Sequence, residues 1–205
     1  MILMGSSHMR YKADDLITRC YSLPSTVPRK HESMTIGNIV FIWRRFLTDY
    51  EKLWTKYLSP LNISSGDIVF VQTGAWDLSQ KKLDYILGPG LALFNKCLAD
   101  IRDRLTGRGA SLVVVTLPPY SDLSTNGDRG GRNNFAIAAF NSLITAAAVN
   151  LGLSVHDEFG VILPRCEEFV CYSHYLCRLS QDKKVHGPVG LVSSNMMLKG
   201  VCVAF

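Results

Sequence analysis

The sequence lacks several features that would assign it to common functional classes. No apolar run reaches the roughly 20 residues that a membrane-spanning helix needs. The first apolar stretch is too short for a signal peptide, and no basic residue precedes it. No CxxC pair, internal repeat or low-complexity segment is present. We therefore expect no membrane segment, no metal site and no cofactor.

Basic residues are numerous but not clustered. The net charge is +5, and the pairs Arg44-Arg45, Lys81-Lys82 and Lys183-Lys184 lie far apart in the chain. Nucleic-acid binding needs a basic patch or stripe, so we interpret these pairs as solvated surface and expect no nucleic-acid partner. A flavodoxin-like nucleotide binder is also disfavoured, because no glycine-rich phosphate loop follows the first apolar segment.

Short apolar runs alternate with helical patterns along the 205 residues, of which 47% are apolar. This alternation predicts a single domain over 1–205 with an α/β fold. The expected architecture is a three-layer α/β/α sandwich with a central parallel sheet of about five strands, of the flavodoxin-like kind. Because the chain begins inside an expected strand, we also expect that segments upstream of it are missing. The expected strands cover 1–4, 36–43, 68–71, 112–116 and 153–155, and the expected helices cover 8–21, 44–58, 91–105, 132–150 and 188–203. In the fourth helix, the face predicted to be apolar carries Phe135, Ala139, Ala146 and Val149.

The first strand ends at Gly5-Ser6-Ser7, and a helical pattern follows. This arrangement places the Ser7 hydroxyl on a sharp strand-to-helix turn, where backbone N–H groups can stabilise an oxyanion. The alternative is that Ser7 caps the helix, since serine is a preferred N-cap residue. His8 is adjacent to Ser7 but does not face it on a helix, so we expect His8 to form a wall of the site.

Other strand ends and one loop supply further candidates. Gly74 follows the third strand, where its N–H can point at an oxyanion; alternatively it only forms a turn, with Asp77 capping and Trp76 packing. His174 lies before the last expected helix and could serve as a base for Ser7, although a loop histidine is often a surface residue. A third member would orient the imidazole. The acidic candidates are Asp157, Glu167 and Glu168.

Three of the six cysteines surround His174. Cys166, Cys171 and Cys177 are crowded within twelve residues, so we expect at least one disulfide there. Asn62-Ile63-Ser64 is a possible glycosylation acceptor. Both features would suit a secretory or extracellular compartment, whereas reduced buried cysteines are the alternative.

Three sequence blocks carry a family resemblance. Gly5-Ser6-Ser7-His8-Met9-Arg10 resembles a GDSHxR block, and Gly74-Ala75-Trp76-Asp77 resembles a GxND block with an aromatic residue in place of Asn. The segment 171–177 resembles a DxxH block followed by an aromatic residue and a cysteine. The chain thus resembles the GDSL/SGNH hydrolase superfamily, in its PC-esterase or trichome-birefringence-like branch. It departs where Ser6 and Cys171 replace the family's Asp, and no second-block glycine follows Trp43.

The resemblance implies an SGNH hydrolase fold and a serine esterase or O-acyltransferase acting on acyl esters, chiefly acetyl esters of glycans. It implies Ser7 as nucleophile, His174 as base and the N–H groups of Ser7 and Gly74 as oxyanion donors. The implied partner is an acylated carbohydrate or a small ester. The alternative is a catalytically impaired binding module that has kept the fold, because the triad acid is missing from its place. The expected substrate-binding residues are His8, Arg10, Trp76 and Asp77.

Overall fold

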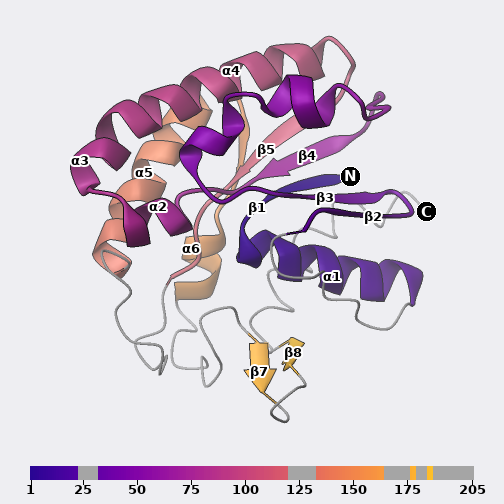
Figure 1. Cartoon of the computed structure of the whole chain (residues 1–205), viewed down its shortest axis with the longest axis horizontal. Coiled ribbons are helices and arrows are strands. Elements are labelled where there is room, and N and C mark those ends of the chain that lie inside the picture. The colour runs from indigo at the N-terminus through magenta and orange to yellow at the C-terminus, as the bar shows by residue number, and fades with distance from the viewer. Residues whose placement is uncertain (23–31, 120–132, 164–175, 179–183, 187–205) are drawn as a thin grey trace.

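The computed structural model describes residues 1–22, 32–119, 133–163, 176–178 and 184–186. In this part of the chain, six strands form one sheet in the order β2-β3-β1-β4-β5-β6 (Figure 1). Five strands are parallel, as the sequence predicts, and β2 pairs with β3 in the antiparallel sense. The strand bounds are β1 Ile2–Gly5, β2 Met34–Ile36, β3 Ile39–Trp43, β4 Ile68–Val71, β5 Ser111–Val115 and β6 Ser154–His156. A separate antiparallel pair is formed by β7 Leu176–Arg178 and β8 Lys184–His186.

Two layers of helices cover the sheet. In β1, Ile2 and Met4 face one apolar cluster, whereas Leu3 faces the other. The first cluster packs under α4 (Leu91–Thr106) and α5 (Asn134–Asn150), and the second packs against α1 (Ser7–Tyr21) on the opposite face (Figure 1). A parallel strand covered on both faces reads as a continuous apolar run, which is why β1, β4 and β5 are visible in the sequence.

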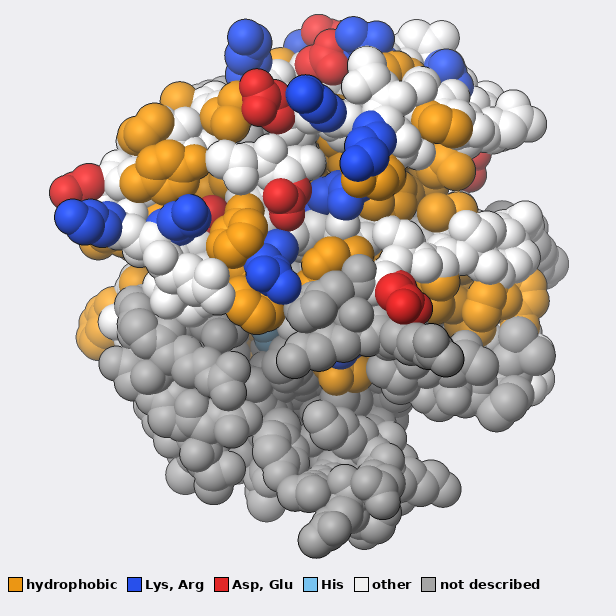
Figure 2. Space-filling view, in the orientation of Figure 1, with side chains coloured by type: hydrophobic (Ala, Val, Ile, Leu, Met, Phe, Trp, Pro, Cys, Tyr) orange, Lys and Arg blue, Asp and Glu red, His pale blue; other side chains and the backbone are white. Residues whose placement is uncertain are grey.

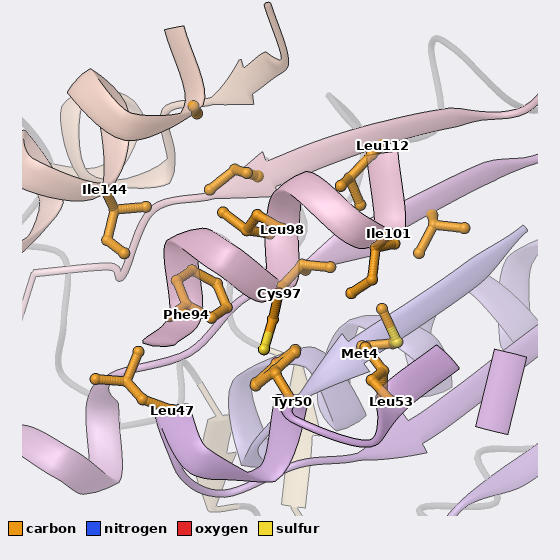
Figure 3. Packing of buried hydrophobic residues seen from close by; sticks show 14 of the residues in the cluster. Met4, Leu47, Tyr50, Leu53, Phe94, Cys97, Leu98, Ile101, Leu112 and Ile144 are labelled. Carbon is orange, nitrogen blue, oxygen red and sulfur yellow. The ribbon is translucent and has the colours of Figure 1, made fainter. Parts of the chain in front are cut away.

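The larger core lies between the sheet and α4. Figure 3 shows Phe94, Leu98 and Ile101 of α4 pointing toward Met4, Leu112 and the segment after β3. Tyr50 and Phe94 meet edge to face, with ring centroids 5.1 Å apart and an interplanar angle of 82°. This geometry aligns the positive edge of one ring with the negative face of the other.

Short helical segments make up much of the connections that follow β3, β4 and β6. Their bounds are η1 Leu47–Tyr50, η2 Trp54–Leu58, α2 Ala75–Gln80, α3 Leu83–Tyr85, η3 Ile86–Gly90 and α6 Glu158–Ile162. The sequence predicts one helix over 44–58, but the structure has a 3-10 turn and a π turn there. It also predicts one strand over 36–43, where the chain instead turns at 37–38 and forms the β2–β3 hairpin.

The predicted core face of α5 is wrong. Phe135 is 91% exposed and Val149 is 63% exposed, whereas Phe140 and Ile144 are buried in the core. The helix carries apolar residues on nearly every side, so its periodicity does not identify the face that packs on the sheet. The helix expected over 188–203 lies outside the described residues.

Candidate active site

The candidate site lies where the strand order reverses. Strand β1 has β3 on one side and β4 on the other, and the chain leaving β1 enters α1 on one face of the sheet. The chain leaving β4 enters α2, whose Ala75 and Leu78 belong to the core on the opposite face. In doubly wound sheets, ligands bind in the crevice that opens at such a point, outside the carboxyl ends of the strands. Ser7 lies two residues after the end of β1, and Gly74 lies three residues after the end of β4.

The ends of β1 and β4 lie in close contact. The N–H of Gln72 donates to the carbonyl of Met4 at 2.9 Å. A Cβ atom at Gly5 would lie 2.6 Å from Cγ of Met9 and 2.8 Å from the carbonyl oxygen of Gln72. Only glycine fits without displacing these neighbours. Gly5 therefore allows the turn before Ser7 to pack directly against the end of β4.

Ser7 is the first residue inside α1, and Ser6 is its N-cap. Ser6 has extended dihedral angles (φ −87°, ψ −154°) and its side chain makes no capping hydrogen bond. The alternative that Ser7 caps the helix is therefore wrong. Ser7 is half-buried at the first turn of α1, where the leading N–H groups of a helix have no partner within the helix. This end of α1 also carries the positive pole of the helix dipole, which favours developing negative charge.

Gly74 has a conformation that other residues rarely adopt. Its φ is +98°, and an added Cβ would lie 2.3 Å from the ring of Phe140 on α5. The glycine thus starts α2 directly after β4 while α5 packs against the turn. Both interpretations of Gly74 made from the sequence require this turn. The structure shows the turn and does not test the donation to an oxyanion.

Asp77 has a supporting position behind the site. Its side chain is fully buried, and Oδ2 accepts a hydrogen bond from the N–H of Leu47 at 3.1 Å. Burial raises the pKa of this carboxyl to about 6, although the hydrogen bond from Leu47 opposes that shift. The carboxyl group holds the start of η1 against α2. In this structure the side chain is buried beside η1, and the expectation that Asp77 contacts substrate stays a prediction.

The other expected binding residues surround the same edge. Trp76 is half-buried on α2, and the guanidinium carbon of Arg45 lies 4.5 Å from the centre of its indole ring. His8 is half-buried on the first turn of α1. Arg10 is buried, with its guanidinium carbon 4.7 Å from the ring centre of Tyr11 and 5.7 Å from that of Trp43. Arg10 is therefore packed against one aromatic ring of α1 and one at the end of β3.

A buried polar network, absent from the sequence-based predictions, lies next to the carboxyl ends of β4 and β5. Nζ of Lys12 lies 2.5 Å from Oε1 of Glu158, with side-chain exposures of 5% and 0%. The amide nitrogen of Gln72 donates to Oε2 of Glu158 and to the carbonyl of Thr116, each at 2.9 Å. The network joins α1, α6 and the ends of β4 and β5. No local pattern identifies it, because Lys12 and Glu158 are 146 positions apart.

Asp157 follows β6 at the same edge and caps α6. Its Oδ1 accepts hydrogen bonds from the N–H of Gly160 at 3.0 Å and the hydroxyl of Thr116 at 3.1 Å. The preceding residue, His156, has a lowered pKa, chiefly because of its burial.

Several residues that the sequence predicts for the site lie outside the described residues. They are His174, Glu167, Glu168, Cys166 and Cys171, and the side chain of Cys177 is not described either. The pairing of Ser7 with His174, the triad acid and the expected disulfide thus stay predictions.

Among the described residues, no group of His, Cys, Asp and Glu side chains is arranged to hold a metal ion. Within the same part of the chain, no helix has the length and apolar character needed to cross a membrane.

No protein-family model matches the chain, and a search of curated proteins finds no match. Solved structures do match it over nearly its whole length. The acetyl xylan esterase AlAXEase has a TM-score of 0.58 and 13% identity, covering 98% of this chain and 100% of that one. The lipase/acylhydrolase from Enterococcus faecalis has a TM-score of 0.53 and 16% identity, covering 97% and 93%. The acetylxylan esterase Axe2 from Geobacillus stearothermophilus has a TM-score of 0.55 and 12% identity, covering 97% and 92%. This likeness shows the fold, a mixed α/β sandwich around a central and mostly parallel sheet, which is the fold class that the sequence predicts.

Proposed function

We propose that this protein is a serine esterase that cleaves acyl esters, with Ser7 as its nucleophile. The observation that carries the proposal is the position of Ser7. It is the first residue of α1, at the carboxyl end of the central strand β1 and beside the turn that Gly74 makes after β4. Structural neighbours described as acetyl xylan esterases and a lipase/acylhydrolase support the same chemistry.

The proposed reaction has two steps. The Ser7 oxygen attacks the acyl carbon while His174 accepts the hydroxyl proton, and the tetrahedral oxyanion faces the N–H groups of Ser7 and Gly74. Collapse breaks the ester bond, and the imidazolium returns the proton to the leaving alcohol. Water then attacks the acyl-enzyme, with His174 again accepting a proton, and releases the acid and free Ser7. With a sugar hydroxyl in place of water, the same steps transfer the acyl group, which is the O-acyltransferase form of the proposal.

The acetyl ester of a glycan is the substrate that we favour. This choice rests on the resemblance of the sequence blocks to the PC-esterase branch and on the acetyl xylan esterases among the structural neighbours. A binding module that has kept the fold is the competing proposal, because Cys171 stands where that branch has an aspartate.

The test compares the wild type with Ser7→Ala and with a matched control, Ser6→Ala. Each protein is labelled with a fluorophosphonate probe and assayed for release of acetate from an acetylated sugar. We expect Ser7→Ala to lose the label and to reduce kcat by about 10³-fold or more, while Ser6→Ala keeps the label. An unlabelled wild type that binds the sugar without turnover would favour the binding module. Labelling of Ser7→Ala at wild-type level would place the nucleophile elsewhere.

A further inference from the structure

The side of α5 that points away from the sheet is apolar. The helix packs on β5 and on the edge strand β6, and its opposite side is open to solvent. Phe135 is 91% exposed there, Val149 is 63% exposed and Leu143 is 39% exposed. The exposed positions recur three or four residues apart, which places them on one face of the helix. This α5 face consists of Phe135, Ala139, Ser142, Leu143, Ala146 and Val149.

The α5 face carries no charge. No Asp, Glu, Lys or Arg occurs between positions 133 and 155, a stretch that contains all of α5. By contrast α4, which is of similar length, has five charged residues, and Figure 2 shows blue and red side chains spread over the top of the molecule, where α4 lies.

The charged neighbours of this stretch add no net charge to it. At its C-terminal end, Nη1 of Arg102 donates to the carbonyl of Leu151 at 3.0 Å, while Nη2 lies 2.6 Å from Oδ1 of Asp103. Asp157, the first acid after the stretch, caps α6, and Arg132, the charged residue before it, lies outside the described residues. An exposed helix face without charge is typical of an interaction site.

The sizes of the residues along the middle of the α5 face follow the same order from either end. Phe135 and Val149 are the large residues at the two ends. The residues on the line between them are small, namely Ala139, Ser142 and Ala146. When two copies of the helix cross in opposite directions, Phe135 of one copy meets Val149 of the other, and the small residues let the helices approach closely. A two-fold axis requires such a self-complementary patch, since each contact is made twice.

Burial of the α5 face leaves the polar group at its centre paired. The hydroxyl of Ser142 donates to the carbonyl of Ala138 within the helix, at 2.9 Å, so covering this side chain costs little. Leu143 lies beside the line of small residues and adds apolar area next to the axis. Two copies also bring no like charges together, because neither α5 face has a charge.

We propose that the α5 face is the contact between two copies of this chain, whose α5 helices cross in opposite directions about a two-fold axis near Ser142. The size of the contact sets its strength. The helix has 17 residues and is about 25 Å long, and a single helix pair covers less than the about 800 Å² per partner of a stable interface. The dimer therefore exchanges with the monomer and forms as the protein concentration rises. This pairing does not depend on the proposed esterase function.

Sedimentation velocity over a range of protein concentrations measures the association. We expect the mass of the wild type to rise from the 22.8 kDa of one chain toward twice that value. Ser142→Glu and Ser142→Lys should each raise the dimer Kd at least tenfold, because two like charges would meet at the axis in an apolar contact. An equimolar mixture of the two variants should associate again, and NaCl should weaken this mixed dimer but not the wild-type dimer.

The matched control is Leu83→Glu, since Leu83 is 50% exposed on α3 and lies outside the α5 face. This variant should dimerise like the wild type. Circular dichroism checks that each variant is folded.

The outcomes separate the possible occupants of the α5 face. Loss of the dimer in both single variants, with recovery in their mixture, supports the antiparallel pair. A wild type that stays monomeric at every concentration overturns it, and so does a dimer that Ser142→Glu leaves unchanged. Failure of the mixture to associate, with both variants folded, excludes a two-fold axis near Ser142. A monomeric wild type that binds phosphatidylcholine vesicles, and no longer binds them as Ser142→Glu, would assign the α5 face to a lipid surface instead.

Discussion

Removing one member of the buried pair Lys12–Glu158 should destabilise the protein far more than a surface ion pair does. In Lys12→Met, the Glu158 carboxylate loses the ammonium group at 2.5 Å while its side chain stays fully buried. The amide of Gln72 still donates to Oε2 at 2.9 Å, but a neutral donor offsets only part of the desolvation of a charge. Breaking a buried pair from one side costs about 3–5 kcal/mol. Because typical domains are stable by about 5–15 kcal/mol, this single change should move the unfolding midpoint strongly.

The double-mutant cycle isolates the pair itself. Glu158→Gln keeps the size of the side chain and an oxygen that can accept from Gln72, while it leaves the Lys12 ammonium without its carboxylate. The variant Lys12→Met/Glu158→Gln has neither charge, so it should lose less stability than the two single changes together. We expect a coupling energy of about 1–3 kcal/mol. The surface pair Arg104–Asp100, four residues apart on α4, is the matched control and should couple by about 0.3–0.5 kcal/mol.

Urea unfolding, followed by circular dichroism and by tryptophan fluorescence, measures each free energy of unfolding, provided that the m-values agree. The coupling of the buried pair should persist in 0.5 M NaCl, whereas the coupling of the surface pair should fall. If the two single changes add within about 0.5 kcal/mol, the pair is not a coupled unit and the reasoning fails.

Two further predictions concern the walls of the site. The pKa of the Asp77 carboxyl is raised from 3.8 to about 6. The protonated carboxyl therefore contributes to the free energy of unfolding below pH 4. This contribution, on the order of 3 kcal/mol, is lost as the pH rises through 6. Asp77→Asn should flatten the dependence of unfolding free energy on pH between 4 and 6; an unchanged slope contradicts the assigned pKa. Gly74→Ala should cost about 2 kcal/mol or more, because it combines a φ of +98° with a Cβ atom 2.3 Å from the ring of Phe140. Gly66→Ala, with a φ of +86° and open space around the Cβ, measures the backbone part alone, so equal losses in the two variants would show that the ring clash is absent.

The sequence predicts the layers of this fold better than the details of the site. Buried parallel strands such as β4 are apolar at every position, so the sheet is visible in the sequence. The sequence does not predict which face of α5 is buried, because apolar residues lie on nearly all sides of the helix. Packing against the sheet buries Phe140 and leaves Phe135 exposed, and the sequence pattern does not distinguish these two residues.

At the site, motif position places Ser7 and Gly74 correctly because each follows an apolar strand. It does not show that Asp77 is buried, because that depends on a hydrogen bond from the N–H of Leu47, 30 positions away. The Lys12–Glu158 pair is invisible in the sequence for the same reason. Local periodicity carries no information on which charge will be buried beside a distant partner.

The edges of the sheet have a consequence for association between chains. Strands β2 and β6, which end the six-stranded sheet, are each only three residues long. A lengthy, flat edge offers unpaired N–H and C=O groups as a template for a strand of another molecule, and short edges offer few. By turning back at 37–38, the chain covers the longer strand β3 with β2. The apolar parallel strands thus stay inside the sheet, where foreign chains cannot pair with them.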